Sequence, residues 1–209
     1  MKYKIDITER VLHFKQPAGT SRGIYTTRKS WFLELTSPDM PGRRGVGECA
    51  PLPSLSCDDI PEYGRTLRAL CDKFEQEGVI DYAVMRPYPS MLFGLETALR
   101  HFEVGSTALF DTPFSRGEEG ITINGLVWMG SYDEMLQRME AKIEQGFHCI
   151  KLKIGAIDFD KELELLRRIR ERFSHREMTI RLDANGAFRF DEALYKLELL
   201  SQYAVHSIE

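Results

Sequence analysis

The feature that most constrains the fold is a regular alternation of strand and helix patterns after residue 120. The expected order is strand 121–128, helix 132–145, strand 149–154, helix 159–173, strand 178–183, helix 191–203 and strand 205–209. Because strands joined by helical crossovers lie parallel in one sheet, this alternation predicts an α/β fold. The sheet is either an open sheet of four strands or the first half of a closed (β/α) barrel of TIM type, which takes about 250 residues.

The first part of the chain has a different pattern, typical of an α+β domain. The expected elements are a strand at 2–15, a loop at 17–23, strands at 29–36 and 43–49, and helices at 61–77 and 90–104. Three strands with short connections form an antiparallel meander. The polar, glycine-bearing residues 115–120 indicate a linker. We therefore expect two domains, at 1–115 and 116–209.

Composition excludes several classes of partner. The formal net charge is −4 and no basic tract stands out, so nucleic acid is not an expected partner. No apolar run approaches the roughly 20 residues of a membrane-spanning helix, and the first residues lack the apolar stretch of a secretory signal. The four cysteines have neither zinc-site nor compact disulfide spacing. We expect a cytoplasmic protein with reduced thiols that acts on a small molecule.

Charged residues recur on one face of the strands after residue 148. Alternate residues of a strand share a face, so Lys151 and Lys153 lie opposite an apolar face. In the same way Asp183 and Glu209 lie opposite apolar neighbours on the next two strands. These positions are near the carboxyl ends of their strands, where the active sites of (β/α) barrels lie.

The residue types in this group suit proton transfer beside a metal ion. Asp183 and Glu209 offer the oxygen ligands that a hard cation prefers. Lys151 and Lys153 are two neighbouring cations in a partly desolvated site, and we expect this to lower a lysine pKa. A neutral amine there would abstract a proton α to a carboxylate. Alone, however, Lys-x-Lys is usually a solvated sheet face.

Residues 121–209 resemble the barrel of the enolase superfamily, in its muconate-lactonizing subgroup. The matching stretches are Ile150–Gly155 (Ile-Lys-Leu-Lys-Ile-Gly), Arg181–Gly186 (Arg-Leu-Asp-Ala-Asn-Gly) and Ser207–Glu209 (Ser-Ile-Glu). Residues 1–110 resemble the capping domain of that superfamily, with Gly45–Pro53 as the matching stretch. The resemblance implies a truncated α/β chain, in which an α+β capping domain precedes the first half of a barrel.

The resemblance implies roles for four residues. Lys153 would be the acid/base catalyst, and Lys151 would support it and bind the substrate carboxylate. Asp183 and Glu209 would be the first two ligands of Mg2+. The third ligand and a second catalytic lysine would lie beyond residue 209, so we expect the 209 residues alone to be inactive.

Within the subgroup, the chain resembles the o-succinylbenzoate synthase family, of the type found in Bacteroides, at Pro51–Ser56 and Asn124–Trp128. The implied reaction is syn dehydration of 2-succinyl-6-hydroxy-2,4-cyclohexadiene-1-carboxylate to 2-succinylbenzoate, through a metal-stabilised enediolate, in menaquinone biosynthesis. Loops of the capping domain would bind the succinyl arm, with Arg22 and Ser54 as candidates. We interpret Trp128 as a packing residue.

Two alternatives stay open. A dipeptide epimerase of the same superfamily shares the lysine pair and the metal ligands. A non-catalytic module would keep the barrel half without its chemistry, and weak magnesium affinity would be typical of it. The sequence is also compatible with a homo-oligomer.

Overall fold

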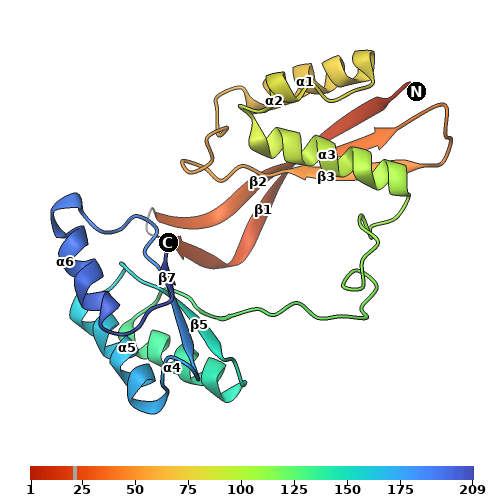
Figure 1. The fold of residues 1–209 in the computed structure, drawn as a ribbon. Helices are drawn as coiled ribbons and strands as arrows, with labels where there is room; N and C mark the ends of the chain where they lie inside the picture. The colour runs from red at the N-terminus through yellow and green to blue at the C-terminus, as the bar shows by residue number, and fades with distance from the viewer. Residues whose placement is uncertain (21–22) are drawn as a thin grey trace. The chain divides into compact units, whose positions relative to one another are not determined.

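The computed structural model describes residues 1–20 and 23–209 and divides into two compact units (Figure 1). One unit comprises residues 1–18 and 25–120, and the other contains residues 121–209. The first holds an antiparallel sheet with helices, and the second holds a parallel sheet with helices. The prediction of an α/β chain with an α+β first part is therefore confirmed.

The first unit is built on a sheet in the order β1-β2-β3. Its elements are β1 (Lys4–Thr20), β2 (Gly23–Thr36), β3 (Arg44–Cys49), α1 (Tyr63–Glu77), α2 (Tyr82–Met85) and α3 (Pro89–Val104). β2 and β3 run antiparallel, with Trp31 opposite Cys49. Leu33, Leu35 and Leu67 are fully buried in the core between the sheet and the helices.

Helix α3 packs on β3 through glycines, because neither backbone leaves room for a side chain. A Cβ added at Gly47 would lie 1.8 Å from the carbonyl oxygen of Gly94. A Cβ added at Gly94 would lie 2.3 Å from Sγ of Cys49. The stretch Gly45–Cys49 therefore has a packing function, which is close approach of strand and helix.

Four expectations for the secondary structure were wrong. The strand expected at 29–36 begins earlier, at Gly23, as β2. The loop expected at residues 17–23 is strand as far as Thr20, since β1 lies at the edge of the sheet, where the missing N–H of Pro17 is tolerated. The strand expected at 121–128 is reduced to β4 (Gly125–Val127). The short helix α2 was not expected; it begins where the Asp81 side chain accepts a hydrogen bond from the Val84 amide.

The second unit is a four-stranded sheet in the order β4-β5-β6-β7, with all neighbouring strands parallel. Its further elements are α4 (Tyr132–Glu144), β5 (Cys149–Lys153), α5 (Phe159–Arg172), β6 (Thr179–Asp183), α6 (Phe190–Ser201) and β7 (Ser207–Ile208). Each helix connects two adjacent parallel strands, as the alternation in the sequence predicts. The sequence places these helices correctly to within two residues at either end.

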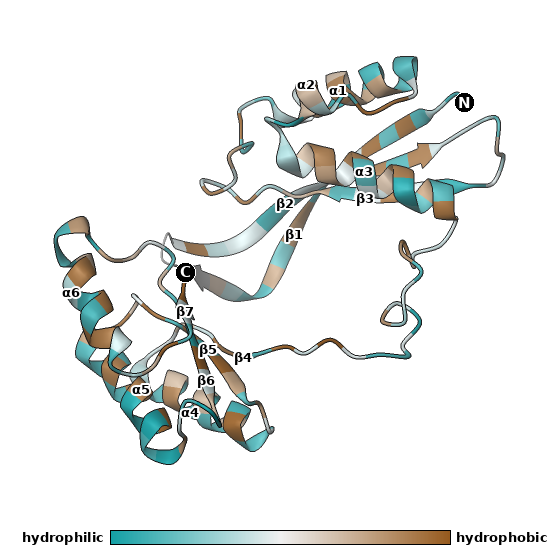
Figure 2. Ribbon diagram, in the orientation of Figure 1, coloured by the Kyte–Doolittle hydropathy of each residue, from teal (hydrophilic) through white to brown (hydrophobic). Residues whose placement is uncertain are grey.

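One face of this sheet forms the core of the unit. Ile150 and Leu152 of β5 and Ile180 and Leu182 of β6 are fully buried, in one cluster with residues of the helices. In Figure 2, the hydrophobic residues of these strands are coloured brown. Each buried aliphatic side chain contributes about 1.5–3 kcal/mol to folding, so this face fixes the register. It follows that Lys151 and Lys153 occupy the opposite face.

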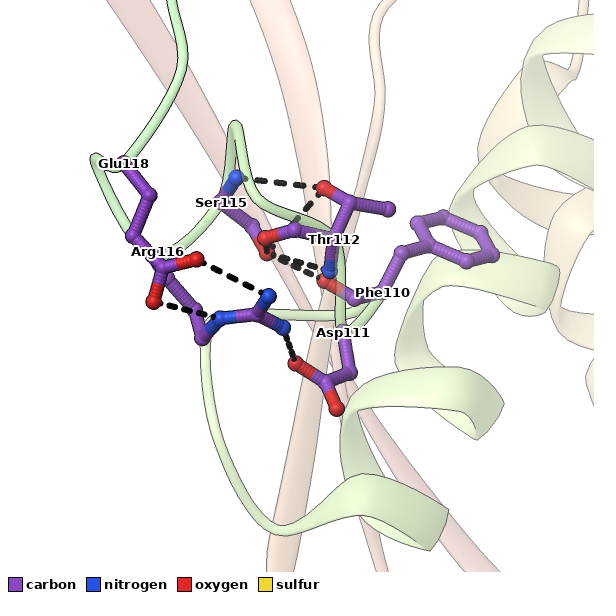
Figure 3. Close-up of polar contacts among 6 residues, drawn as sticks. All are labelled: Phe110, Asp111, Thr112, Ser115, Arg116 and Glu118. Atoms are coloured by element: carbon purple, nitrogen blue, oxygen red, sulfur yellow. Dashed lines mark hydrogen bonds and ion pairs between the residues drawn. The ribbon is translucent and has the colours of Figure 1, made fainter.

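Residues 105–124 connect the last helix of the first unit to β4 without a helix or strand. Within them, Ser115 accepts a hydrogen bond from the Thr112 amide and donates one to the Phe110 carbonyl, at 3.0 and 2.6 Å (Figure 3). Arg116 binds both carboxylate oxygens of Glu118 and pairs with Asp111. Local contacts of this kind give the segment a defined turn.

None of the helices among residues 1–20 and 23–209 has the length and apolarity that crossing a bilayer requires.

Candidate active site

Strand β5 carries the two lysines that the sequence singles out. Lys151 and Lys153 lie two residues apart on the face opposite the apolar core, with side chains 18% and 16% exposed. Burial of this degree removes most of the water from both ammonium groups. It requires compensating charges, because a buried cation without a partner is costly.

Asp183, the last residue of β6, supplies that compensation. It stands opposite Lys153 in the register of β5 and β6, and its side chain is 7% exposed. Its Oδ2 atom lies 2.6 Å from Nζ of Lys153 and 3.3 Å from Nζ of Lys151. Its Oδ1 atom accepts a hydrogen bond of 3.1 Å from the amide of Asn185. Both carboxylate oxygens are thus used, and the carboxylate is held in place.

Glu209 joins the group from the strand on the other side of β6. Its Oε1 atom lies 2.6 Å from Nζ of Lys151, and its side chain is 60% exposed. Its backbone is fixed beside β6, since its amide donates to the Leu182 carbonyl and its carbonyl accepts from the Ala184 amide. Lys151 therefore bridges Asp183 and Glu209. The structure brings together the four residues that the sequence places at one end of the sheet.

The expected lowering of a lysine pKa is wrong for Lys151. The hydrogen bond to Glu209 raises the pKa of Lys151 above its usual value, and the hydrogen bond to Asp183 adds to the rise. For Asp183, burial acts to raise the pKa, but the hydrogen bonds from Lys153 and Lys151 outweigh it, and the pKa is lowered. Each of the two neighbouring lysines has a carboxylate oxygen 2.6 Å from its Nζ atom, from Glu209 for Lys151 and from Asp183 for Lys153.

Trp128 also belongs to the site, although from the sequence we interpreted it as a packing residue. Trp128 is 39% exposed, and Nζ of Lys153 lies 5.3 Å from its ring centroid, within the range of a cation–π contact. The pairing of β4 with β5 explains why Trp128 lies near Lys153. Val127 pairs with Leu152, so Trp128 is the next residue, beside Lys153.

Asp183 and Glu209 suit a hard cation by the chemistry of their donors, and they present two carboxylates at adjacent strand ends. In the described part of the chain, no group of three or more His, Cys, Asp or Glu side chains is arranged to hold a metal ion. The two carboxylates therefore fit part of a magnesium site. In this structure their oxygens accept hydrogen bonds from Lys151 and Lys153.

Two further candidates lie outside this group. Arg22 is outside the described residues. Ser54 belongs to the first unit, where it has a φ of 59° and its amide donates to Oδ2 of Asp59 at 2.7 Å. Its substrate-binding role stays a prediction.

Two family models match the chain. Residues 3–102 match the model described as "MenC, N-terminal domain". Residues 134–209 match the model described as "Enolase C-terminal domain-like".

An o-succinylbenzoate synthase from Desulfotalea psychrophila is 40% identical to the chain over 230 residues, which cover 95% of the chain and 62% of that protein. The chain therefore spans less than two thirds of the length of this relative. Among solved structures, MenC from the same organism matches with a TM-score of 0.75 at 32% identity, over 100% of this chain and 64% of that one. An o-succinylbenzoate synthase from Thermosynechococcus elongatus, complexed with Mg in its active site, matches in fold with a TM-score of 0.64 at 22% identity, over 100% of this chain and 60% of that one.

Proposed function

Because the chain belongs to the enolase superfamily and is similar to its o-succinylbenzoate synthases, we propose that it forms part of a dehydratase that makes 2-succinylbenzoate. The substrate would be 2-succinyl-6-hydroxy-2,4-cyclohexadiene-1-carboxylate, and the second product would be water. One observation carries the proposal most directly. Nζ of Lys153 lies at the carboxyl end of β5, within 2.6 Å of Asp183 and beside the partly exposed ring of Trp128. These positions suit a base that faces a cyclic substrate.

Lys153 would perform both proton transfers. Its neutral amine takes the proton from the ring carbon that carries the carboxylate. The electron pair of that C–H bond is first delocalised onto the carboxylate, and it then forms the new ring double bond as the neighbouring C–O bond breaks. The ammonium of Lys153 then gives its proton to the departing hydroxyl, which leaves as water. Since one group serves both steps, hydrogen and hydroxyl leave from the same side of the ring.

Lys151 would bind and orient the substrate carboxylate. In this structure its ammonium pairs with Glu209 and Asp183, and these contacts raise its pKa. A cation that stays protonated is suited to holding an anion and unsuited to removing a proton. We therefore assign Lys151 as the binding group and Lys153 as the base.

Asp183 and Glu209 would hold Mg2+, which when bound supplies stabilisation of the negative charge that develops on the substrate carboxylate. To serve as ligands, both carboxylates must exchange their hydrogen bonds to Lys151 and Lys153. Release of Asp183 from Lys153 would also leave that amine free to act as a base. We further propose that the 209 residues alone have no appreciable turnover, because the described part of the chain contains no group of three or more potential metal ligands.

The test uses the full product of the gene that contains these residues. It is incubated with the cyclohexadiene carboxylate and Mg2+, and the aromatic product is followed by ultraviolet absorbance. We expect turnover that is lost with EDTA and restored by added Mg2+. A parallel assay follows epimerisation of an Ala-Glu dipeptide. Epimerisation without formation of the aromatic product would replace the proposed reaction with that of a dipeptide epimerase. Turnover that persists in EDTA would contradict the role of Mg2+.

A further inference from the structure

Glu162 is a buried carboxylate that the proposed chemistry does not use. It lies in the first turn of α5 and is 1% exposed. Its Oε1 atom accepts a hydrogen bond of 2.6 Å from the amide of Gly155, and the amides of Ala156 and Ile157 act to lower the pKa of its carboxylate. Glutamates are almost never fully buried without partners. Here the hydrogen-bond partner is the backbone amide of Gly155, in the loop that follows β5.

This loop directly follows the strand that carries Lys153. Gly155 has a φ of +91°, which favours glycine, and a Cβ there would lie 2.4 Å from Cβ of Ala187. The amide of Ile154 donates to the backbone carbonyl of Asp183 at 2.9 Å. The loop is therefore packed against the segment that follows β6. The residue before the loop, Ile154, directly follows Lys153 and is hydrogen-bonded to the backbone of Asp183.

A cation from the next helix compensates the buried charge. Burial raises the pKa of Glu162, while the three amides and the positive charge of Lys196 on α6 act to lower it. Nζ of Lys196 lies 5.0 Å from the ring centroids of Phe159 and Phe188, and 2.8 Å from Oε1 of Glu192. Lys196 is thus fixed by its own contacts, which keeps the surroundings of Glu162 constant.

We propose that Glu162 is a positioning residue for the proposed dehydration. Its carboxylate holds the 155–157 loop, and the loop fixes the end of β5 from which Lys153 reaches the substrate. The role rests on the proposed function, because that function makes Lys153 the acid/base. Glu162 itself would touch neither substrate nor metal, so its loss would change the placement of Lys153 and leave substrate binding nearly unchanged.

The test compares Glu162→Ala and Glu162→Gln with Asp160→Asn in the full gene product. Asp160 is an exposed carboxylate in the same helical turn and serves as the matched control. Activity is measured below the melting temperature of every variant. We expect kcat to fall about 10- to 100-fold in Glu162→Ala with KM changed less than about threefold, since small misplacements of a catalytic group have effects of this size. Glu162→Gln keeps one acceptor oxygen and should recover part of the loss. Asp160→Asn should behave as the wild type.

Amide hydrogen exchange of residues 154–157 gives a readout that does not depend on turnover. We expect exchange at least about tenfold faster in Glu162→Ala, intermediate in Glu162→Gln, and unchanged at residues 149–151. Unchanged exchange at 154–157 in Glu162→Ala would overturn the inference, whether or not the wild type is active. Faster exchange with an unchanged kcat would overturn it as well. Absence of turnover in the wild type would refute the proposed function, and with it the role of Glu162 in catalysis, while the exchange data would still decide whether Glu162 holds the loop.

Discussion

Nζ of Lys153 lies 2.6 Å from Oδ2 of Asp183, and the same oxygen also receives Nζ of Lys151 at 3.3 Å. A single carboxylate oxygen therefore compensates two cations that come from one face of one strand. All three side chains are less than one fifth exposed, so water screens them little. This arrangement makes Asp183 the residue on which the electrostatic balance of the site depends.

Replacement of Lys153 by alanine should abolish turnover while the protein stays folded. The proposed reaction needs one amine for both proton transfers, and general acid–base catalysis contributes about 10²–10⁴-fold to a rate. We expect kcat to fall by at least about 10³-fold, measured as formation of the aromatic product. Lys161→Ala is the control, since the side chain of Lys161 is 55% exposed on α5. Turnover of Lys153→Ala within tenfold of the control would contradict the assignment.

Replacement of Asp183 by asparagine should destabilise the fold. The change leaves the ammonium groups of Lys151 and Lys153 facing each other without their shared carboxylate. We expect the free energy of unfolding to fall by about 1–3 kcal/mol, the cost of leaving buried charged groups poorly satisfied. Asp191→Asn breaks an exposed ion pair with Arg189 and should change little. Equal losses in the two variants, measured by urea denaturation, would argue against the special role of Asp183.

The same carboxylate predicts an acid limit to stability. Burial alone would raise the pKa of Asp183, but the hydrogen bonds from Lys153 and Lys151 lower it below the usual 3.8. A carboxyl group whose pKa is lowered in the folded state stabilises the fold fully at any pH above its pKa in the unfolded state. This stabilisation is lost as the pH falls through its pKa in the folded state. Below about pH 4, stability should fall more steeply in the wild type than in Asp183→Asn. Parallel pH profiles for the two proteins would show that Asp183 contributes nothing to the slope.

The sequence predicts the site well where strand geometry decides it. Side chains alternate along β5 and β6, and the ends of parallel strands meet at one edge, so Lys151, Lys153, Asp183 and Glu209 had to come together. The sequence does not predict properties that depend on contacts between individual atoms. Proximity of two lysines predicted a lowered pKa, but the hydrogen bond from Lys151 to Glu209 reverses the sign.

Other features depend on packing between segments far apart in the sequence. From the sequence, Glu162 is an ordinary acidic residue in the first turn of a helix, and only the folded loop shows that its carboxylate accepts a hydrogen bond from the Gly155 amide. Pro17 reads as a loop residue, and only the strand order shows that β1 is an edge that accepts it. Local propensity cannot give contacts of this kind.

Gly47 should not tolerate even one added methyl group. An alanine Cβ would lie 1.8 Å from the carbonyl oxygen of Gly94, and backbone on backbone cannot move aside as a side chain can. We expect Gly47→Ala to lower the free energy of unfolding by at least about 3 kcal/mol, the upper range for overpacking. Gly120→Ala meets no atom within 4 Å and should stay within about 1 kcal/mol of the wild type. Thermal melts of both variants measure the difference, and similar melting temperatures would contradict the close packing of α3 on β3.

The four cysteines should react with a thiol reagent in an order set by burial. All four are free; Cys57 is exposed, Cys149 is partly buried, and Cys49 and Cys71 are buried. Burial also raises the pKa of Cys71 to about 12, so at pH 8 its reactive thiolate is roughly a thousandfold rarer than that of a thiol with a pKa of about 9. Labelling followed by mass spectrometry should show Cys57 modified first, then Cys149, with Cys49 and Cys71 modified only after urea is added. Cys57→Ser should remove the first phase and leave the others, because all four cysteines are free and no disulfide links them. Labelling of Cys71 as fast as Cys57 in the native protein would mean that the core between α1 and the sheet opens far more readily than its complete burial implies.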